Sequence, residues 1–238
     1  MRVLEIGTYV SVAYGGMVLA EQGHEVTKWT AERRDPVQDL DGGERLWSWL
    51  NAGKTLVRRH ASEITSLGAQ ETDPGFDVVI DNIRAVTWKA WGVDLAAEAR
   101  RMCIPWISLR DDFDGQGFDA IAQARAWGDH IGYVPAYLGD TAGGLWLAFK
   151  ALSAVASHRE DHQVIRQAGV LAKLVEGELI DVVRDGVRTP WDPPGTYGAD
   201  PHAHGTEVHY RGKIVREPFR DGAWRRKNIP NDQGRIIV

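Results

Sequence analysis

The sequence lacks features that would place it in several large classes of protein. Its 238 residues include one cysteine, Cys103, which excludes an internal disulfide bond and a zinc site built from cysteines. No apolar run approaches the roughly 20 residues of a membrane span, and Met1-Arg2 leads directly into a strand pattern rather than a signal peptide. A net charge of −5 offers no excess of basic residues for nucleic acid. We therefore expect a cytoplasmic protein that binds neither nucleic acid nor a membrane.

Three common functional motifs are also missing. The turn at Gly7 does not continue as Gly-x-Gly-x-x-Gly, and Trp29-Thr30 stands where a dinucleotide-binding strand would end in a ribose-binding carboxylate. The chain contains no phosphate-binding P-loop and no Gly-x-Ser-x-Gly nucleophile motif. A nicotinamide-dependent dehydrogenase, a P-loop nucleotidase and an α/β-hydrolase are therefore not indicated.

What the sequence contains is an alternation of strand and helix patterns. Residues 2–6 read as a buried strand, 12–22 as a helix ended by Gly23, and 25–29 as a second strand, which together form a βαβ unit. Further strands are predicted at 55–57, 76–80 and 104–108, and further helices at 60–67, 95–102 and 118–127. The pattern predicts an α/β fold with a Rossmann-like parallel sheet and flanking helices, with helices dominating 118–175.

The composition changes near the C-terminus. One more strand is predicted at 178–183, and from Arg184 prolines lie among glycines and charges, with one hairpin expected around Arg211-Gly212. We therefore predict two parts: an α/β domain over 1–185 and a loop-rich extension over 186–238. The extension is expected to pack on the main domain or on a partner subunit.

Asp140 precedes the strongest helical pattern in the chain. Apolar residues at helical spacing start at Leu145, and Asp140 behind a glycine occupies the position of an N-cap, where backbone N–H groups and the helix dipole favour the ionised carboxylate. Gly143 and Gly144 cost about 1 kcal/mol each relative to alanine and permit close approach of another chain or a ligand. Two interpretations remain open at this point, an ordinary helix cap and a nucleophile.

Six segments occur in the same order as the motifs of one enzyme family. They are the opening strand–loop–helix–strand at 2–28, Leu-Asn-Ala-Gly-Lys at 50–54, Asp-Val-Val-Ile-Asp-Asn-Ile-Arg at 77–84 followed by Trp-Gly-Val-Asp at 91–94, Gly-Phe-Asp-Ala-Ile-Ala-Gln-Ala at 117–124, Gly-Asp-Thr-Ala-Gly-Gly-Leu at 139–145, and Glu-Gly-Glu-Leu-Ile-Asp-Val at 176–182. In this order the chain resembles the class III CoA-transferases, which include formyl-CoA transferase, carnitine CoA-transferase and the α-methylacyl-CoA racemases.

The resemblance implies a reaction and a set of site residues. In the family, an aspartate attacks an acyl-CoA to form a mixed anhydride and then an enzyme thioester, so that CoA moves to a carboxylic acid; that aspartate falls on Asp140. CoA is then a substrate, and no permanently bound cofactor is expected. Family contacts to CoA fall on Thr8, Tyr9, Val10, Ser11, Asn82 and Ile83, with Arg34 and Lys89 on or beside basic positions. Gly143, Gly144 and Phe118 would lie near the substrate.

The chain also departs from the family pattern. Family members are longer, and their small second domain is largely missing from this sequence; a glycine-rich lid has no counterpart. Phe118 stands where the racemase branch has a histidine, which disfavours racemisation. Two alternatives therefore stay open: a non-catalytic or heteromeric subunit that retains the fold, and a divergent acyl-CoA or acyl-carrier lyase or isomerase. Because family subunits interlock in pairs, we expect a homodimer, or a complex with a longer homologous subunit.

Histidines gather at 202, 204 and 209. Those at 202 and 204 would point the same way on a strand. Without a cysteine or a neighbouring acidic cluster to complete a ligand set, we predict no metal site there.

Overall fold

The computed structural model describes residues 1–67, 75–110, 119–127 and 137–176, together with four strands at 181–184, 187–189, 206–210 and 213–217. Contacts within the chain define two compact units, one comprising Met1–Gly117 and Asp140–Gln167 and the other Phe118–Gly139 and Ala168–Val238. The predicted domain boundary between 185 and 186 stays a prediction.

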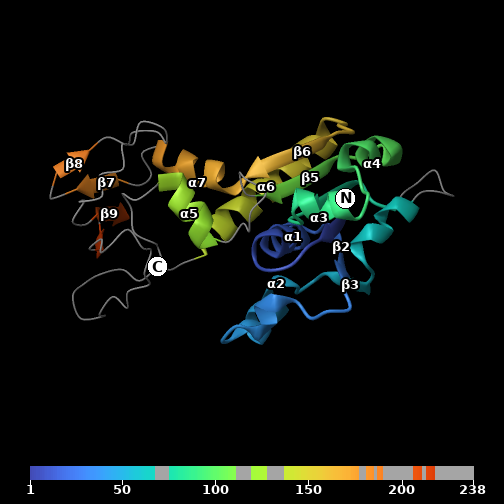
Figure 1. The fold of residues 1–238 in the computed structure, drawn as a ribbon, viewed down its shortest axis with the longest axis horizontal. Helices are drawn as coiled ribbons and strands as arrows, with labels where there is room; N and C mark the ends of the chain where they lie inside the picture. Colours follow the sequence, from blue (N-terminus) through green and yellow to red (C-terminus); the bar gives the residue numbers. More distant parts are fainter. Residues whose placement is uncertain are drawn as a thin grey trace. The chain divides into compact units, whose positions relative to one another are not determined.

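A six-stranded sheet forms the centre of the first unit (Figure 1). Its strands are β1 (Arg2–Ile6), β2 (Glu25–Thr30), β3 (Thr55–Arg58), β4 (Val78–Asp81), β5 (Trp106–Arg110) and β6 (His162–Arg166). The order is β3-β2-β1-β4-β5-β6, and every neighbouring pair is parallel, which confirms the predicted parallel α/β sheet. The chain order reverses between β1 and β4. The loops that follow these two strands therefore open side by side at the carboxyl edge, where α/β sheets bind ligands.

Helices cover both faces of this sheet. The first unit contains α1 (Ser11–Glu21), α2 (Gly43–Leu50), α3 (Ala85–Ala90), α4 (Leu95–Met102), most of α6 (Leu138–Ala156), and the short 3-10 helices η1 (Pro36–Asp39) and η2 (Ala61–Ser66). On one face, Trp88 of α3 and Ala99 of α4 belong to the same core cluster as Leu4, Ile6 and Trp106. On the other face, Gly16 of α1 lies against the side chain of Glu5, because adjacent strand residues point to opposite faces.

The structure corrects the sequence prediction at two elements of this unit. Residues 162–166 form β6, an edge strand paired with β5, although a helical region was predicted there. Only Ile165 of β6 is buried, so the strand lacks the continuous apolar run of a central parallel strand. Helix α6 begins at Leu138 rather than at Leu145, so it contains Asp140 and both glycines.

The second unit contains α5 (Asp119–Trp127), α7 (Gln167–Glu176) apart from its first residue, and a four-stranded antiparallel sheet. The sheet order is β10-β9-β7-β8, with β7 at Asp181–Arg184, β8 at Val187–Thr189, β9 at Thr206–Tyr210 and β10 at Lys213–Glu217. Tyr210 pairs with Lys213, which confirms the hairpin expected around Arg211-Gly212. The strand predicted at 178–183 is β7 and lies in this sheet rather than in the parallel one.

Two searches of the described residues bear on ligands and membranes. No helix among them is long and apolar enough to cross a bilayer. No group of three or more histidine, cysteine, aspartate or glutamate residues among them is arranged to hold a metal ion. His209 lies in β9, whereas His202 and His204 fall outside the described residues, so the histidine cluster stays untested.

Candidate functional site

Asn82 joins the two loops that the sequence singled out at the sheet edge. Its side-chain amide nitrogen donates to the carbonyl oxygen of Thr8 at 2.7 Å and to Oγ of Ser11 at 3.2 Å. Its Oδ1 accepts from the backbone N–H of Thr8 at 3.2 Å. A Cβ atom at Gly7 would overlap the Asn82 amide, so this position requires glycine. The structure therefore brings residues 8–11 and 82 together.

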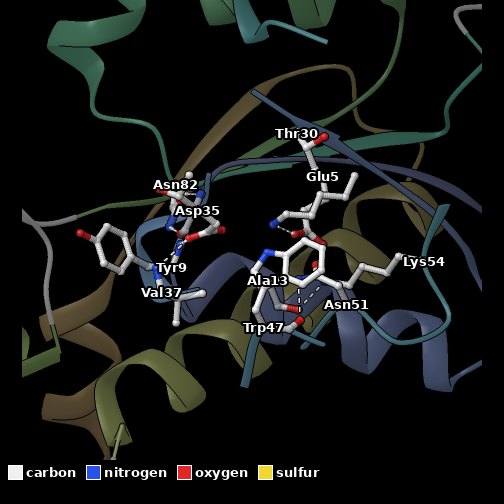
Figure 2. A network of polar contacts seen from close by, with 12 residues as sticks. Glu5, Tyr9, Ala13, Thr30, Asp35, Val37, Trp47, Asn51, Lys54 and Asn82 are labelled. Atoms are coloured by element: carbon white, nitrogen blue, oxygen red, sulfur yellow. Dashed lines mark hydrogen bonds and ion pairs between the residues drawn. The ribbon is translucent and has the colours of Figure 1, made fainter. Parts of the chain in front are cut away.

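A second acceptor holds the other side of the 8–11 loop. Tyr9 has a positive φ of 63°, a conformation that is uncommon outside glycine, and its N–H donates to Oδ1 of Asp35 at 3.1 Å. The same oxygen accepts from the N–H of Val37 at 3.1 Å, as part of the capping box of η1. Figure 2 shows Tyr9 beside Asn82 and Asp35. The loop is thus fixed by side chains from two other segments. Sequence reasoning did not identify Asp35.

Asp140 lies in the first turn of α6 and is buried, with 7% of its surface exposed. This corrects the prediction of a sterically open N-cap, because α6 starts two residues before Asp140. Its Oδ1 accepts a hydrogen bond of 2.7 Å from Nε2 of Gln167, the first residue of α7. Gln167 is itself 2% exposed and was not singled out in the sequence. Because β6 was not predicted, nothing in the sequence placed the residue that follows β6 beside Asp140.

The two glycines after Asp140 contact this chain's own elements. A Cβ on Gly144 would lie 2.6 Å from the carbonyl oxygen of Ser11 and 3.0 Å from the backbone nitrogen of Gly15, so α6 and α1 meet backbone to backbone. A Cβ on Gly143 would lie 3.1 Å from Cδ2 of Leu109. The close approach inferred from these glycines is therefore helix and sheet packing, rather than the room for a ligand that the sequence left open.

This packing brings Asp140 near the 8–11 loop. Asp140 and Gly144 lie four residues apart, on the same face of α6, and about 6 Å apart along its axis. Gly144 lies against Ser11, whose hydroxyl is bonded to Asn82. A continuous set of contacts thus runs from Asn82 through Ser11 and Gly144 to the helical turn that carries Asp140.

The remaining predicted residues are arranged less distinctively. Val10 is buried as the residue before α1, and Ile83 is partly buried against the core cluster. Arg34 is half-exposed and pairs with Glu44 and, at 3.9 Å, with Asp39. Lys89 is exposed on α3. Phe118 lies outside the described residues.

A buried cluster of charges lies beneath α1, and the sequence analysis did not identify its role. Glu5 of β1 accepts from Nζ of Lys28 at 2.6 Å and from Nζ of Lys54 at 2.7 Å. Lys54 also donates to the carbonyl oxygen of Ala13 at 2.7 Å and to Asn51 at 3.3 Å (Figure 2). The Leu-Asn-x-Gly-Lys segment therefore fastens the end of α2 to α1 and β1. The sequence signal that could have indicated this cluster is a charged residue within each of two strands, Glu5 in β1 and Lys28 in β2.

Opposing effects set the pKa values in this cluster. Burial alone would raise the pKa of Glu5, but the two ammonium groups outweigh it and lower that pKa. Burial, with repulsion from Lys28, lowers the pKa of Lys54 to about 8 in spite of its attraction to Glu5.

A second buried carboxylate, Asp81, ends β4 on the opposite face of the sheet. Its Oδ1 accepts from Nε1 of Trp88 at 3.0 Å and from the N–H of Ile83 at 2.9 Å. Its Oδ2 accepts from Nε1 of Trp106 at 2.7 Å and from Oγ of Ser108. All four donors are neutral.

Asp81, Ser108 and His162 are not a catalytic triad. Oγ of Ser108 gives its proton to Asp81, so Nε2 of His162, 2.9 Å away, is the donor in their contact rather than the base. Ser108 is fully buried, out of reach of a substrate. In a triad, the histidine would accept the serine proton.

Comparison with known proteins bears on the fold. No family model matches the sequence, and no curated protein matches it. Rv3272, a hypothetical protein from Mycobacterium tuberculosis, is similar in structure with a TM-score of 0.61 and 22% identity, over 75% of this chain and 57% of that one. A CAIB/BAIF family protein from Brucella suis has a TM-score of 0.61 and 16% identity, over 74% and 55%. This chain spans a little over half the length of these proteins, and the likeness shows that about three quarters of this chain shares their fold.

Proposed function

We propose that the chain is a CoA-transferase-like enzyme of the class III family, which moves CoA from an acyl-CoA to a carboxylic acid. The observation that carries this proposal is the contact between Gly144 of α6 and Ser11, which brings the turn holding Asp140 to the loop held by Asn82. Residues 8–11 and 82–83 would contact CoA, and Asp140 would meet the thioester. The CoA-transferase-like fold supports the same assignment.

Asp140 would act as a nucleophile in its ionised form. A carboxylate oxygen attacks the thioester carbonyl carbon, the C–S bond breaks, and the CoA thiolate leaves, which forms a mixed anhydride between Asp140 and the acyl group. The thiolate then attacks the Asp140 carbonyl carbon, which releases the donor acid and leaves an aspartyl–CoA thioester. The acceptor carboxylate attacks the carbonyl carbon of that thioester and expels the CoA thiolate, which gives a second mixed anhydride. The thiolate then attacks the acceptor's acyl carbon, which forms the new acyl-CoA and releases the Asp140 carboxylate. Covalent catalysis of this kind divides one difficult transfer into easier steps.

The hydrogen bond from Gln167 suits this chemistry. The donor is a neutral amide, which lies 2.7 Å from Oδ1 of Asp140 and adds no positive charge beside the proposed nucleophile. It also fixes the orientation of the Asp140 carboxylate through Oδ1.

The burial of Asp140 supports a second candidate, a CoA-binding subunit that has kept the fold without the chemistry. A nucleophile has to reach its substrate, and 7% exposure gives little access in the ligand-free chain. We also propose that the chain acts with a partner, which is either a second copy of this chain or a longer homologous subunit.

Asp140→Asn distinguishes the two candidates. With a panel of acyl-CoA donors and carboxylic acids, we expect the wild type to transfer CoA and the variant to lose at least about a thousandfold in kcat, with its Kd for CoA changed less than about threefold. Asp161→Asn, the same change at a half-exposed position, is the control for general damage. CoA binding without turnover by the wild type would favour the subunit. Full activity of a folded Asp140→Asn would contradict the proposed mechanism.

A further inference from the structure

We propose that Asp81 is a positioning residue that holds the 82–83 turn, and through Asn82 the 8–11 loop, in shape before any ligand arrives. The inference rests on the proposed CoA site, because these are the segments assigned to CoA there. Asp81 itself is fully buried and touches neither CoA nor the reacting atoms.

The Asp81 carboxylate is fixed by a full set of donors. Each oxygen accepts two hydrogen bonds, one of them from an indole N–H. Rotation of the carboxylate would break all four bonds in a site closed to water, where unsatisfied polar groups are costly. Asp81 is therefore held in one orientation by β5 and α3.

That orientation determines the turn after β4. Oδ1 holds the N–H of Ile83, two residues along the chain, in an Asx-turn. The residue between them is Asn82, whose side chain then meets the carbonyl oxygen and the N–H of Thr8 and the hydroxyl of Ser11. Asp81 thus affects the 8–11 loop indirectly, through Asn82, without contacting the loop itself.

The groups around Ser108 maintain the direction of its hydroxyl. Its oxygen accepts from Nη2 of Arg110 at 3.2 Å and contacts Nε2 of His162 at 2.9 Å, so its own proton is left for Asp81. Arg110 also lies 3.9 Å from Asp81, which adds electrostatic attraction to the hydrogen bonds.

The other end of β4 provides a matched control. Asp77 precedes β4 by one residue, and its carboxylate accepts from the backbone N–H of Arg2 at 2.6 Å and from the Arg2 guanidinium at 2.7 Å. It is also an aspartate, and it belongs to the same segment as Asp81. Its bonds lie at the amino edge of the sheet, away from the turn at 82–83.

Hydrogen exchange on the ligand-free full chain tests the inference. Asp81→Asn should exchange the amides of 8–11 and 82–84 at least about tenfold faster than the wild type, with the amides of β2 unchanged. Asp77→Asn should leave both loop segments as in the wild type. Faster exchange at 82–84 alone, or equal acceleration throughout the sheet, would overturn the proposal.

Calorimetric titration with CoA adds a second, separable readout. We expect a Kd about tenfold higher in Asp81→Asn and unchanged in Asp77→Asn, with any kcat that the wild type shows retained within about threefold at saturation. Absence of CoA binding by the wild type would count against the proposed function, while the exchange result would still decide the role of Asp81.

If Asp81→Asn does not fold, Trp88→Phe offers a second test, because it removes one hydrogen-bond donor to Oδ1 of Asp81. It should accelerate the same two segments, and unchanged exchange there would overturn the inference.

Discussion

Glu5 and Asp81 are two carboxylates buried in the same sheet, and the protein stabilises them in opposite ways. Glu5 faces α1 and is bonded to two ammonium groups, those of Lys28 and Lys54. Asp81 faces α3 and is bonded to two indoles, a hydroxyl and a backbone N–H, with the nearest cationic nitrogen at 3.9 Å.

The difference separates two structural tasks. The ionic cluster around Glu5 joins β1, β2 and the end of α2, with one more positive than negative charge among its three side chains. Asp81 instead accepts four directional hydrogen bonds. Such bonds constrain the conformation of a turn more tightly than ion pairs, whose geometry varies more. We therefore expect changes at Glu5 to act mainly on global stability, and changes at Asp81 to act on the order of the nearby loops.

The largest expected effect is that of Glu5→Gln. It leaves two ammonium groups buried without a counter-charge, and the free energy of unfolding should fall by about 3–5 kcal/mol. Asp81→Asn keeps a carbonyl acceptor and should lose less, about 1–3 kcal/mol. Urea denaturation measures both. Glu21→Gln, at an exposed position of α1, is the control and should stay within about 0.5 kcal/mol. Equal losses in the free energy of unfolding from Glu5→Gln and Asp81→Asn would contradict the proposed difference between the two sites.

The pH dependence of stability should reveal Lys54. Its pKa is about 8 in the folded chain and 10.5 ordinarily, so between these values the unfolded chain binds a proton that the folded chain does not. The free energy of unfolding should therefore rise with pH across this window, by at most about 3 kcal/mol relative to Lys54→Met. Below pH 8 both states are protonated and the two curves should run parallel. Parallel curves throughout the window would show that Lys54 is not destabilised in its charged form.

The smallest effect should come from an exposed pair of the same type. The hydrogen bond from Arg159 lowers the pKa of Asp161 to about 2, and both side chains are about half exposed. Because solvent screens this pair, Asp161→Asn should change stability by less than about 0.5 kcal/mol at pH 7. Any contribution of the carboxylate should disappear as pH falls from 3.8 to 2. If Asp161→Asn lowered the free energy of unfolding as much as Glu5→Gln, burial would not determine how much a charged pair contributes to stability.

The sequence predicted the sheet and both loops of the site because their signals are local. Apolar strands alternate with amphipathic helices over the first 110 residues, and Gly7 and Asn82 follow two such strands. Parallel strands end at a common edge, so both loops were expected at the same edge of the sheet, and the pairing of β1 with β4 brings them together. The partner of each Asn82 atom was not predictable, since it depends on how β1 and β4 pair.

The surroundings of Asp140 were less predictable. Glycines reduce helix propensity, so a helix start at Leu145 was the better local interpretation. Tertiary packing overrides it, because Gly144 allows α6 to lie directly against Ser11 and Gly15. Edge strand β6 has a weak apolar pattern and was not predicted. Because Gln167 follows β6 directly, its contact with Asp140 was not predicted either. The Trp88 and Trp106 bonds to Asp81 likewise depend on contacts across the sheet.

The most direct test of the proposed chemistry is the mass of the peptide that contains Asp140, after incubation of the full chain with acetyl-, butyryl- or succinyl-CoA and rapid quenching. We predict an added mass equal to the acyl group or to CoA, located at Asp140 and removed by hydroxylamine. CoA transfer with no covalent change at Asp140, or with the added mass on another residue, would contradict the account.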